Sequence, residues 1–149
     1  MKYVIVLMVL LSSVVLYNFY KINESHAIHS SVQQEIERND YVDFSALVEG
    51  DWDTIILVTP YTSKAELKEK YGIAVNRISN FSIEYLDDRM LVVFCQGKRI
   101  QDYMYWTGRL SLSKGEQLYE TTRIKREDAQ FKIDETHPAS MPLNLIQVN

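Results

Sequence analysis

The longest apolar stretch of the chain lies near its N-terminus, where residues 3–20 form eighteen positions without a formal charge. At 1.5 Å per helical residue, this length approaches the roughly 30 Å thickness of a bilayer's hydrocarbon core. The stretch is also longer than the apolar core of a typical cleaved signal peptide. The pattern therefore favours a transmembrane anchor within residues 1–27.

A cleaved signal peptide is the alternative for the same segment. Ser25 and Ala27 place small side chains at the two positions that a signal peptidase inspects, so cleavage after Ala27 fits the sequence. The flanking charges, Lys2 before the stretch and Lys21 after it, give only a weak orientation bias. We expect a single-pass membrane protein with its domain outside the cytoplasm, or else a periplasmic or secreted domain.

The segments that follow carry a helical pattern and then a strand pattern. Residues 28–40 are polar, with Val32 and Ile36 four positions apart, which predicts a short helix or a tether. Thr54–Val58 is β-branched or apolar throughout, as an interior strand requires. Pro60 ends this strand because proline cannot donate to a sheet hydrogen bond.

A helix over residues 64–71 is predicted from its two ends. Ser63 stands three positions before Glu66, which is the spacing of a capping box. Gly72 supplies the left-handed conformation that commonly ends a helix. Good helix formers fill the positions between them.

The second half of the chain predicts strands. Alternation from Phe81 to Tyr85 indicates a half-buried strand, and Asp87 with Asp88 forms a turn before the apolar run Met90–Phe94. Three further segments are expected after that run: a strand over residues 99–106, a last strand within residues 117–125, and an extended tail over residues 137–149.

These elements predict an α+β fold. Consecutive strands with short links pair antiparallel. We therefore expect a domain over residues 41–136 built on a mostly antiparallel sheet of four to five strands. The helix over residues 64–71 packs on one face of that sheet.

Composition and missing motifs narrow the function. The formal net charge of −4 argues against a nucleic-acid partner, because nucleic acids are polyanions that bind to basic surfaces. Cys95 is the one cysteine, which excludes an intramolecular disulfide, and its apolar surroundings predict a buried side chain. The chain lacks the common hydrolase, zinc, redox and nucleotide motifs. We expect no catalytic residue, metal or cofactor, and hence not an enzyme.

Two groups of residues are candidates for contact with a protein partner. One is an acidic turn and the other is an aromatic strand whose two faces both carry large apolar side chains. Together the predicted contact residues are Asp51, Trp52, Asp53, Tyr103, Tyr105 and Trp106. The alternative for the aromatic residues is a place in the core of the sheet.

Three functions remain open on this evidence. The leading hypothesis is a non-enzymatic protein-binding module of the inhibitor, immunity or envelope-assembly type, attached to a membrane through residues 3–20. The second is a hydrolase or transferase that uses carboxylates near Asp51, Asp53 and Asp87, which requires these groups to converge. The third is a structural subunit of an envelope complex.

One stretch of the sequence also carries a family resemblance. Trp52 and Asp53 lead into an apolar strand, followed by Pro60, Tyr61 and Thr62 and then a short charged helix. This order resembles a pattern in small uncharacterised bacterial lipoproteins and exported proteins. The resemblance implies export and no particular enzymatic activity. We interpret Pro60 to Thr62 as a rigid corner, with Tyr61 closing the sheet edge and Thr62 or Ser63 capping the helix.

Overall fold

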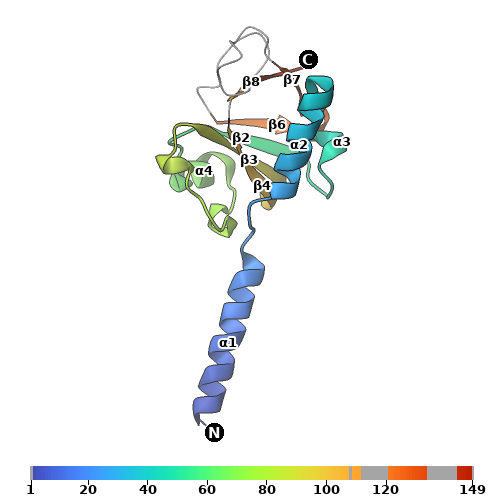
Figure 1. Cartoon of the computed structure of the whole chain (residues 1–149). Coiled ribbons are helices and arrows are strands. Elements are labelled where there is room, and N and C mark those ends of the chain that lie inside the picture. Colours follow the sequence, from blue (N-terminus) through green and yellow to red (C-terminus); the bar gives the residue numbers. More distant parts are fainter. Residues whose placement is uncertain (1, 108, 112–120, 134–143, 149) are drawn as a thin grey trace.

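The computed structural model describes residues 2–107, 109–111, 121–133 and 144–148. For residues 2, 18, 19, 109–111 and 144 it describes the backbone alone. The first helix, α1 (Lys2–Tyr20), projects away from the rest of the chain, as Figure 1 shows. Among the described residues, no helix combines the length and the apolar character that a membrane crossing requires.

The polar segment after α1 is a helix and not a tether. α2 covers His26–Asn39, and its N-cap is Ser25, whose hydroxyl accepts a hydrogen bond from the Ile28 backbone N–H. The helix therefore begins ahead of the predicted residue 28. Val32 and Ile36 are buried, so the four-residue spacing of these side chains correctly identified the core-facing side.

The larger sheet has the strand order β4-β3-β2-β6, and all its pairings are antiparallel. Its strands are β2 (Thr54–Val58), β3 (Arg89–Gln96), β4 (Arg99–Thr107) and β6 (Thr122–Lys125). The predicted interior strand and the β3–β4 hairpin are confirmed. β6 pairs with β2 and not with β4, so the expectation that consecutive strands pair with each other is wrong for this strand.

A second, smaller sheet has the order β1-β7-β8-β5. Its strands are short: β1 (Tyr41–Asp43), β5 (Arg109–Ser111), β7 (Gln130–Ile133) and β8 (Asn144–Gln147). β1, β7 and β8 pair antiparallel, and β5 pairs parallel with β8. Part of the predicted C-terminal tail is therefore a strand, while residues 137–143 and 149 lie outside the described residues.

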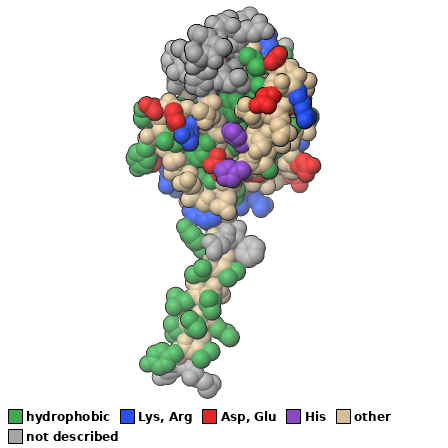
Figure 2. Space-filling model, in the orientation of Figure 1, with side chains coloured by type: hydrophobic (Ala, Val, Ile, Leu, Met, Phe, Trp, Pro, Cys, Tyr) green, Lys and Arg blue, Asp and Glu red, His purple; other side chains and the backbone are tan. Residues whose placement is uncertain are grey.

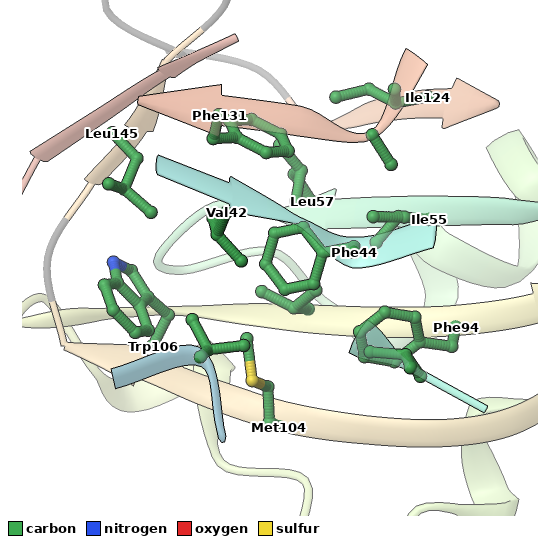
Figure 3. Close-up of a cluster of buried hydrophobic side chains, with 14 of the residues drawn as sticks. Val42, Phe44, Ile55, Leu57, Phe94, Met104, Trp106, Ile124, Phe131 and Leu145 are labelled. Atoms are coloured by element: carbon green, nitrogen blue, oxygen red, sulfur yellow. The ribbon is translucent and has the colours of Figure 1, made fainter. Parts of the chain in front are cut away.

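Two hydrophobic cores lie on opposite faces of the larger sheet. One fills the space between the two sheets and α2, and it includes Phe44, Phe94, Trp106 and Phe131, as Figure 3 shows. Phe44 comes from the short helix α3 (Phe44–Leu47). Burial on both faces explains why the central strands are almost continuously apolar.

The second core is covered by the loops between β2 and β3. These loops contain α4 (Lys64–Tyr71) and the short 3-10 helices η1 (Val75–Arg77) and η2 (Ile83–Tyr85). α4 has the predicted bounds, with Ser63 as its N-cap and Gly72 at φ 67° as its C-cap. Leu67 and Ile83 are fully buried here against Ile56 and Val93 of the sheet.

The predicted strand over Phe81–Tyr85 is wrong. The chain forms η2 there, and its backbone makes one-turn hydrogen bonds instead of pairing with a strand. Ile83 is buried while Tyr85 is exposed, although the alternation had placed the two side chains on one face. A third 3-10 helix, η3 (Arg126–Asp128), forms the corner between β6 and β7 and so joins the two sheets.

Candidate functional site

The predicted aromatic contact residues are buried. Tyr103 and Trp106 have exposed fractions of 0% and 2%, and Tyr105 reaches 6%. Tyr103 and Tyr105 lie in the core under the loops, whereas Trp106 lies in the core between the sheets. The prediction of an exposed aromatic surface on β4 is therefore wrong, because both faces of this strand are covered.

The two buried tyrosines hold a loop in place through their hydroxyl groups. The Tyr105 hydroxyl accepts from the Ser82 backbone N–H at 2.8 Å and donates to the Asn80 carbonyl at 2.9 Å. The Tyr103 hydroxyl lies 3.4 Å from that of Ser79. Burial raises the pKa of Tyr103 above its ordinary value. These phenols are structural links between β4 and residues 79–82.

The residues of the acidic turn differ in their exposure to solvent. Asp51 is exposed, but Trp52 is 3% exposed and packs against Phe94. The Arg126 guanidinium stacks on the Trp52 ring at 4.6 Å and donates to the carbonyls of Gly50 and Trp52 at 2.8 and 3.2 Å. Trp52 therefore anchors this turn and offers no surface to a partner.

Asp53 has a structural role in the same turn. Its carboxylate accepts from the Gly97 backbone N–H at 2.8 Å and from the Thr54 hydroxyl at 3.0 Å. Gly97 has a φ of 58° in the reversal between β3 and β4, a conformation that glycine adopts without steric cost. Asp53 thereby ties the start of β2 to this reversal.

The candidate catalytic carboxylates do not converge. Asp53 lies beside the end of β3, since the adjacent Thr54 pairs with Cys95. Asp87 precedes the start of β3 at Arg89. Six strand residues at about 3.4 Å each separate the two ends, or roughly 20 Å. Paired carboxylates in glycosidases stand within about 10 Å of each other, so this geometry does not support the carboxylate mechanism.

Cys95 provides no reactive group that the geometry supports. Cys95 is fully buried, and burial raises the pKa of its thiol to about 12. A thiol with so high a pKa is protonated at neutral pH and is a poor nucleophile. Among the described residues, no cluster of three or more potential ligands could hold a metal ion.

The exposed aromatic side chains of the domain lie elsewhere, on the loops that cover the second core. Outside α1, the exposed large hydrophobic residues of the described chain are Tyr61, at 65%, and Tyr85, at 81%. A hydrogen bond of 2.9 Å from the Tyr61 backbone N–H to the Ile83 carbonyl joins the two loops. We call this pair the Tyr61–Tyr85 surface.

Contacts with neighbouring residues fix both loops. The Lys64 backbone N–H donates to the Glu84 carboxylate at 2.7 Å, which links α4 to η2. Phe81 lies half-buried at the side, with the Lys64 ammonium 5.3 Å from its ring. Ile83 anchors η2 in the core. The two tyrosine side chains are therefore presented on a preorganised backbone.

Tyr61 has an unusual backbone conformation, with a φ of 64°. The left-handed region costs a residue with a Cβ roughly 1–2 kcal/mol. Around it, the hydroxyls of Thr59, Thr62 and Thr121 form a buried cluster with oxygen separations of 3.1–3.4 Å. This cluster fixes the residues on either side of Tyr61. The Tyr61 side chain itself is 65% exposed, so the prediction that it closes the sheet edge is wrong.

Sequence reasoning missed the Tyr61–Tyr85 surface for two separate reasons. The sequence predicts a rigid corner at Tyr61, and only the position of this residue between Pro60 and a helix cap indicates a special conformation. Tyr85 was placed in a strand that does not form. Ser63 does cap α4, since its hydroxyl accepts from the Glu66 backbone N–H at 3.1 Å.

The comparisons with known proteins give no family for this chain. No protein-family model matches it, and neither a curated protein nor a solved structure matches it at a significant level. The resemblance to small bacterial exported proteins therefore stays a prediction.

Proposed function

We propose that the chain is a membrane-attached, non-enzymatic protein-binding module. In this proposal α1 inserts into a lipid bilayer, the domain lies outside the cytoplasm, and the Tyr61–Tyr85 surface contacts the partner. The observation that carries the binding proposal is Tyr61 itself, an exposed aromatic side chain held in a left-handed conformation.

The exposure of α1 supports membrane attachment. Figure 2 shows apolar side chains along the visible face of this helix, and the large hydrophobic side chains that the structure describes in α1 are 44–90% exposed. Surface of this kind is unfavourable in water, and monomeric soluble proteins rarely present it in one continuous region. A lipid environment solvates the same side chains without this cost.

The contacts of the segment after α1 support retention of the helix in the mature protein. The Ser25 backbone N–H donates to the Tyr103 carbonyl at 2.9 Å, and Glu24 accepts from the Tyr105 N–H at 3.2 Å. Ile22 bridges to Ile78 as a short parallel pair. Cleavage after Ala27 would remove these contacts and the N-cap of α2, which disfavours the signal-peptide alternative.

Backbone strain supports a role for Tyr61 in recognition. Glycine or asparagine would adopt the same φ at lower cost, so an exposed tyrosine is not what the fold alone requires here. Strained residues of this kind cluster at functional sites. Tyrosine is also enriched in protein interfaces, because its ring supplies apolar area and its hydroxyl a hydrogen bond.

Site-specific photocrosslinking in membranes tests the proposal. A photoreactive phenylalanine analogue is placed at Tyr61 in one version of the full chain and at Tyr85 in another. We expect both positions to give a crosslinked adduct of the same mass, because a backbone hydrogen bond from Tyr61 to Ile83 joins the two loops that carry these exposed side chains. The matched control places the analogue at Lys132, an exposed position on β7.

Three results would contradict the proposal. Adducts of different mass from positions 61 and 85 would show that the two residues do not share a partner. An adduct from position 132 of the same mass and yield would show that the crosslinking is non-specific. Crosslinking only between copies of the chain would show that the surface mediates self-association and does not bind another protein.

A further inference from the structure

The junction between α1 and the domain is a hydrogen-bonded joint. The Ile22 backbone N–H donates to the Arg77 carbonyl at 2.7 Å, and the Ser79 N–H donates to the Ile22 carbonyl at 2.9 Å. The Ser79 hydroxyl donates to the Asn23 side chain at 2.9 Å. Because both backbone groups of Ile22 are paired with the domain, the segment directly after α1 is held against residues 77–79.

Two cations lie at this joint, directly after the apolar helix. The Lys21 ammonium donates to the Asn76 carbonyl at 2.6 Å, and the Arg77 guanidinium donates to the carbonyls of Tyr20 and Ile100 at 3.4 and 3.3 Å. Among the described residues, neither is paired with a carboxylate. Figure 2 shows Lys and Arg side chains at the end of the domain from which α1 emerges.

Aromatic rings accompany the two cations. The Lys21 ammonium is 5.4 Å from the Tyr17 ring, and the Arg77 guanidinium is 5.6 Å from the Tyr20 ring. Tyrosine rings followed by basic residues mark the level of the headgroups at the end of a membrane-inserted helix. The cations therefore lie where the phosphates of a lipid layer would be, although the chain as a whole is acidic.

We propose that Lys21 and Arg77 form a binding site for the phosphate of anionic phospholipids at the base of the domain. The proposal rests on the insertion of α1 and adds a lipid preference to it. Charge complementarity and continuity with α1 both favour a lipid headgroup over a soluble anion. Bound lipid holds the base of the domain on the membrane.

A lipid titration of the full chain in neutral detergent micelles tests this site. Short-chain phosphatidylglycerol is compared with phosphatidylcholine. Binding is measured from the NMR chemical-shift changes of the backbone amides of Ile22 and Ser79. A basic residue near a membrane surface contributes roughly a fivefold change in affinity for anionic lipid. We expect phosphatidylglycerol to bind more tightly than phosphatidylcholine, and K21Q to reduce that preference about fivefold.

Matched variants separate charge from fold. R77K keeps the charge and should retain the preference, whereas K21Q/R77Q should abolish it. K132Q removes a cation from β7, far from α1 in Figure 1, and should change nothing. If K21Q/R77Q unfolds in a thermal melt, K21Q alone decides, because the hydrogen bond from Lys21 to the Asn76 carbonyl lies at an exposed position.

Several outcomes would overturn the site. Equal binding of the two lipids would do so, as would a preference unchanged by K21Q or equally reduced by K132Q. Competition by inorganic phosphate at the same concentration would identify a soluble anion as the ligand. A chain that does not enter micelles or vesicles at all would instead contradict the insertion of α1, so the two failures are distinguishable.

Discussion

Two pairs of tyrosines in this chain differ in their exposure to solvent. Tyr103 and Tyr105 are buried on β4, and their hydroxyl groups form hydrogen bonds with the loop at residues 79–82. Tyr61 and Tyr85 stand exposed on loops of the same layer, and their rings project from backbone that other residues fix. The comparison shows that the amino-acid type does not decide between core and contact surface. Whether a tyrosine is buried or exposed depends on which elements cover its strand or loop.

Truncation of Tyr105 should produce the largest difference between the two pairs. Y105A removes a buried ring and leaves the Ser82 N–H and the Asn80 carbonyl without their partner. We expect a loss of about 3–5 kcal/mol in the free energy of unfolding, by analogy with other aromatic truncations in cores. Y85A should cost less than about 0.5 kcal/mol. Denaturant unfolding of the two variants measures the contrast, and equal losses would refute it.

The same buried layer should make stability depend on alkaline pH through Cys95. Burial raises the pKa of this thiol from 9.0 to about 12, so the folded state keeps its proton while the unfolded state loses it. The stability is complete below about pH 9 and falls as the pH rises toward 12, by at most about 1.4 kcal/mol per pH unit. Unfolding at pH 8 and pH 10.5 measures the loss.

The variant C95A provides the control for this pH dependence. It lowers stability at every pH because it leaves a small cavity, but it should lose less additional stability between pH 8 and pH 10.5 than the parent chain. If the parent and C95A show the same pH dependence, the thiol is accessible to water and the layer is not closed.

Replacement of Tyr61 by glycine should have a smaller effect of opposite sign. Y61G relieves the left-handed strain, and the greater flexibility of the unfolded chain offsets part of the gain. We expect a net stabilisation of about 0.5–1 kcal/mol together with loss of the crosslink from position 85. A destabilisation of more than 1 kcal/mol would mean that the Tyr61 ring supports the fold, and thermal melts detect either result.

The local elements were largely predictable from the sequence. β2 and α4 have the predicted bounds because each carries its own signals: an apolar run in one, and a cap at either end in the other. The pairing of β6 with β2 was not predictable, since it depends on which sheet edge remains free after β3 and β4 have formed a hairpin.

The candidate site was predictable only in its residue type. Tyrosines were expected at the contact surface, but the loops that cover β4 come from residues 59–88, and no local pattern reveals that packing. The alternation from Phe81 to Tyr85 imitates a strand, but in η2 Ile83 is fully buried in the core while Tyr85 is exposed. Tertiary packing overrode the period-two signal here.

The amount of partner that copurifies with the full chain from membranes tests the central claim most directly. The double variant Y61S/Y85S is compared with the parent chain and with K132Q, and the melting temperature of each is measured alongside. We predict that Y61S/Y85S melts within a few degrees of the parent and loses at least about tenfold of the partner bound, the loss expected for roughly 1.4 kcal/mol of binding energy. A double variant that stays folded and retains its partner would contradict the assignment of the Tyr61–Tyr85 surface as the contact.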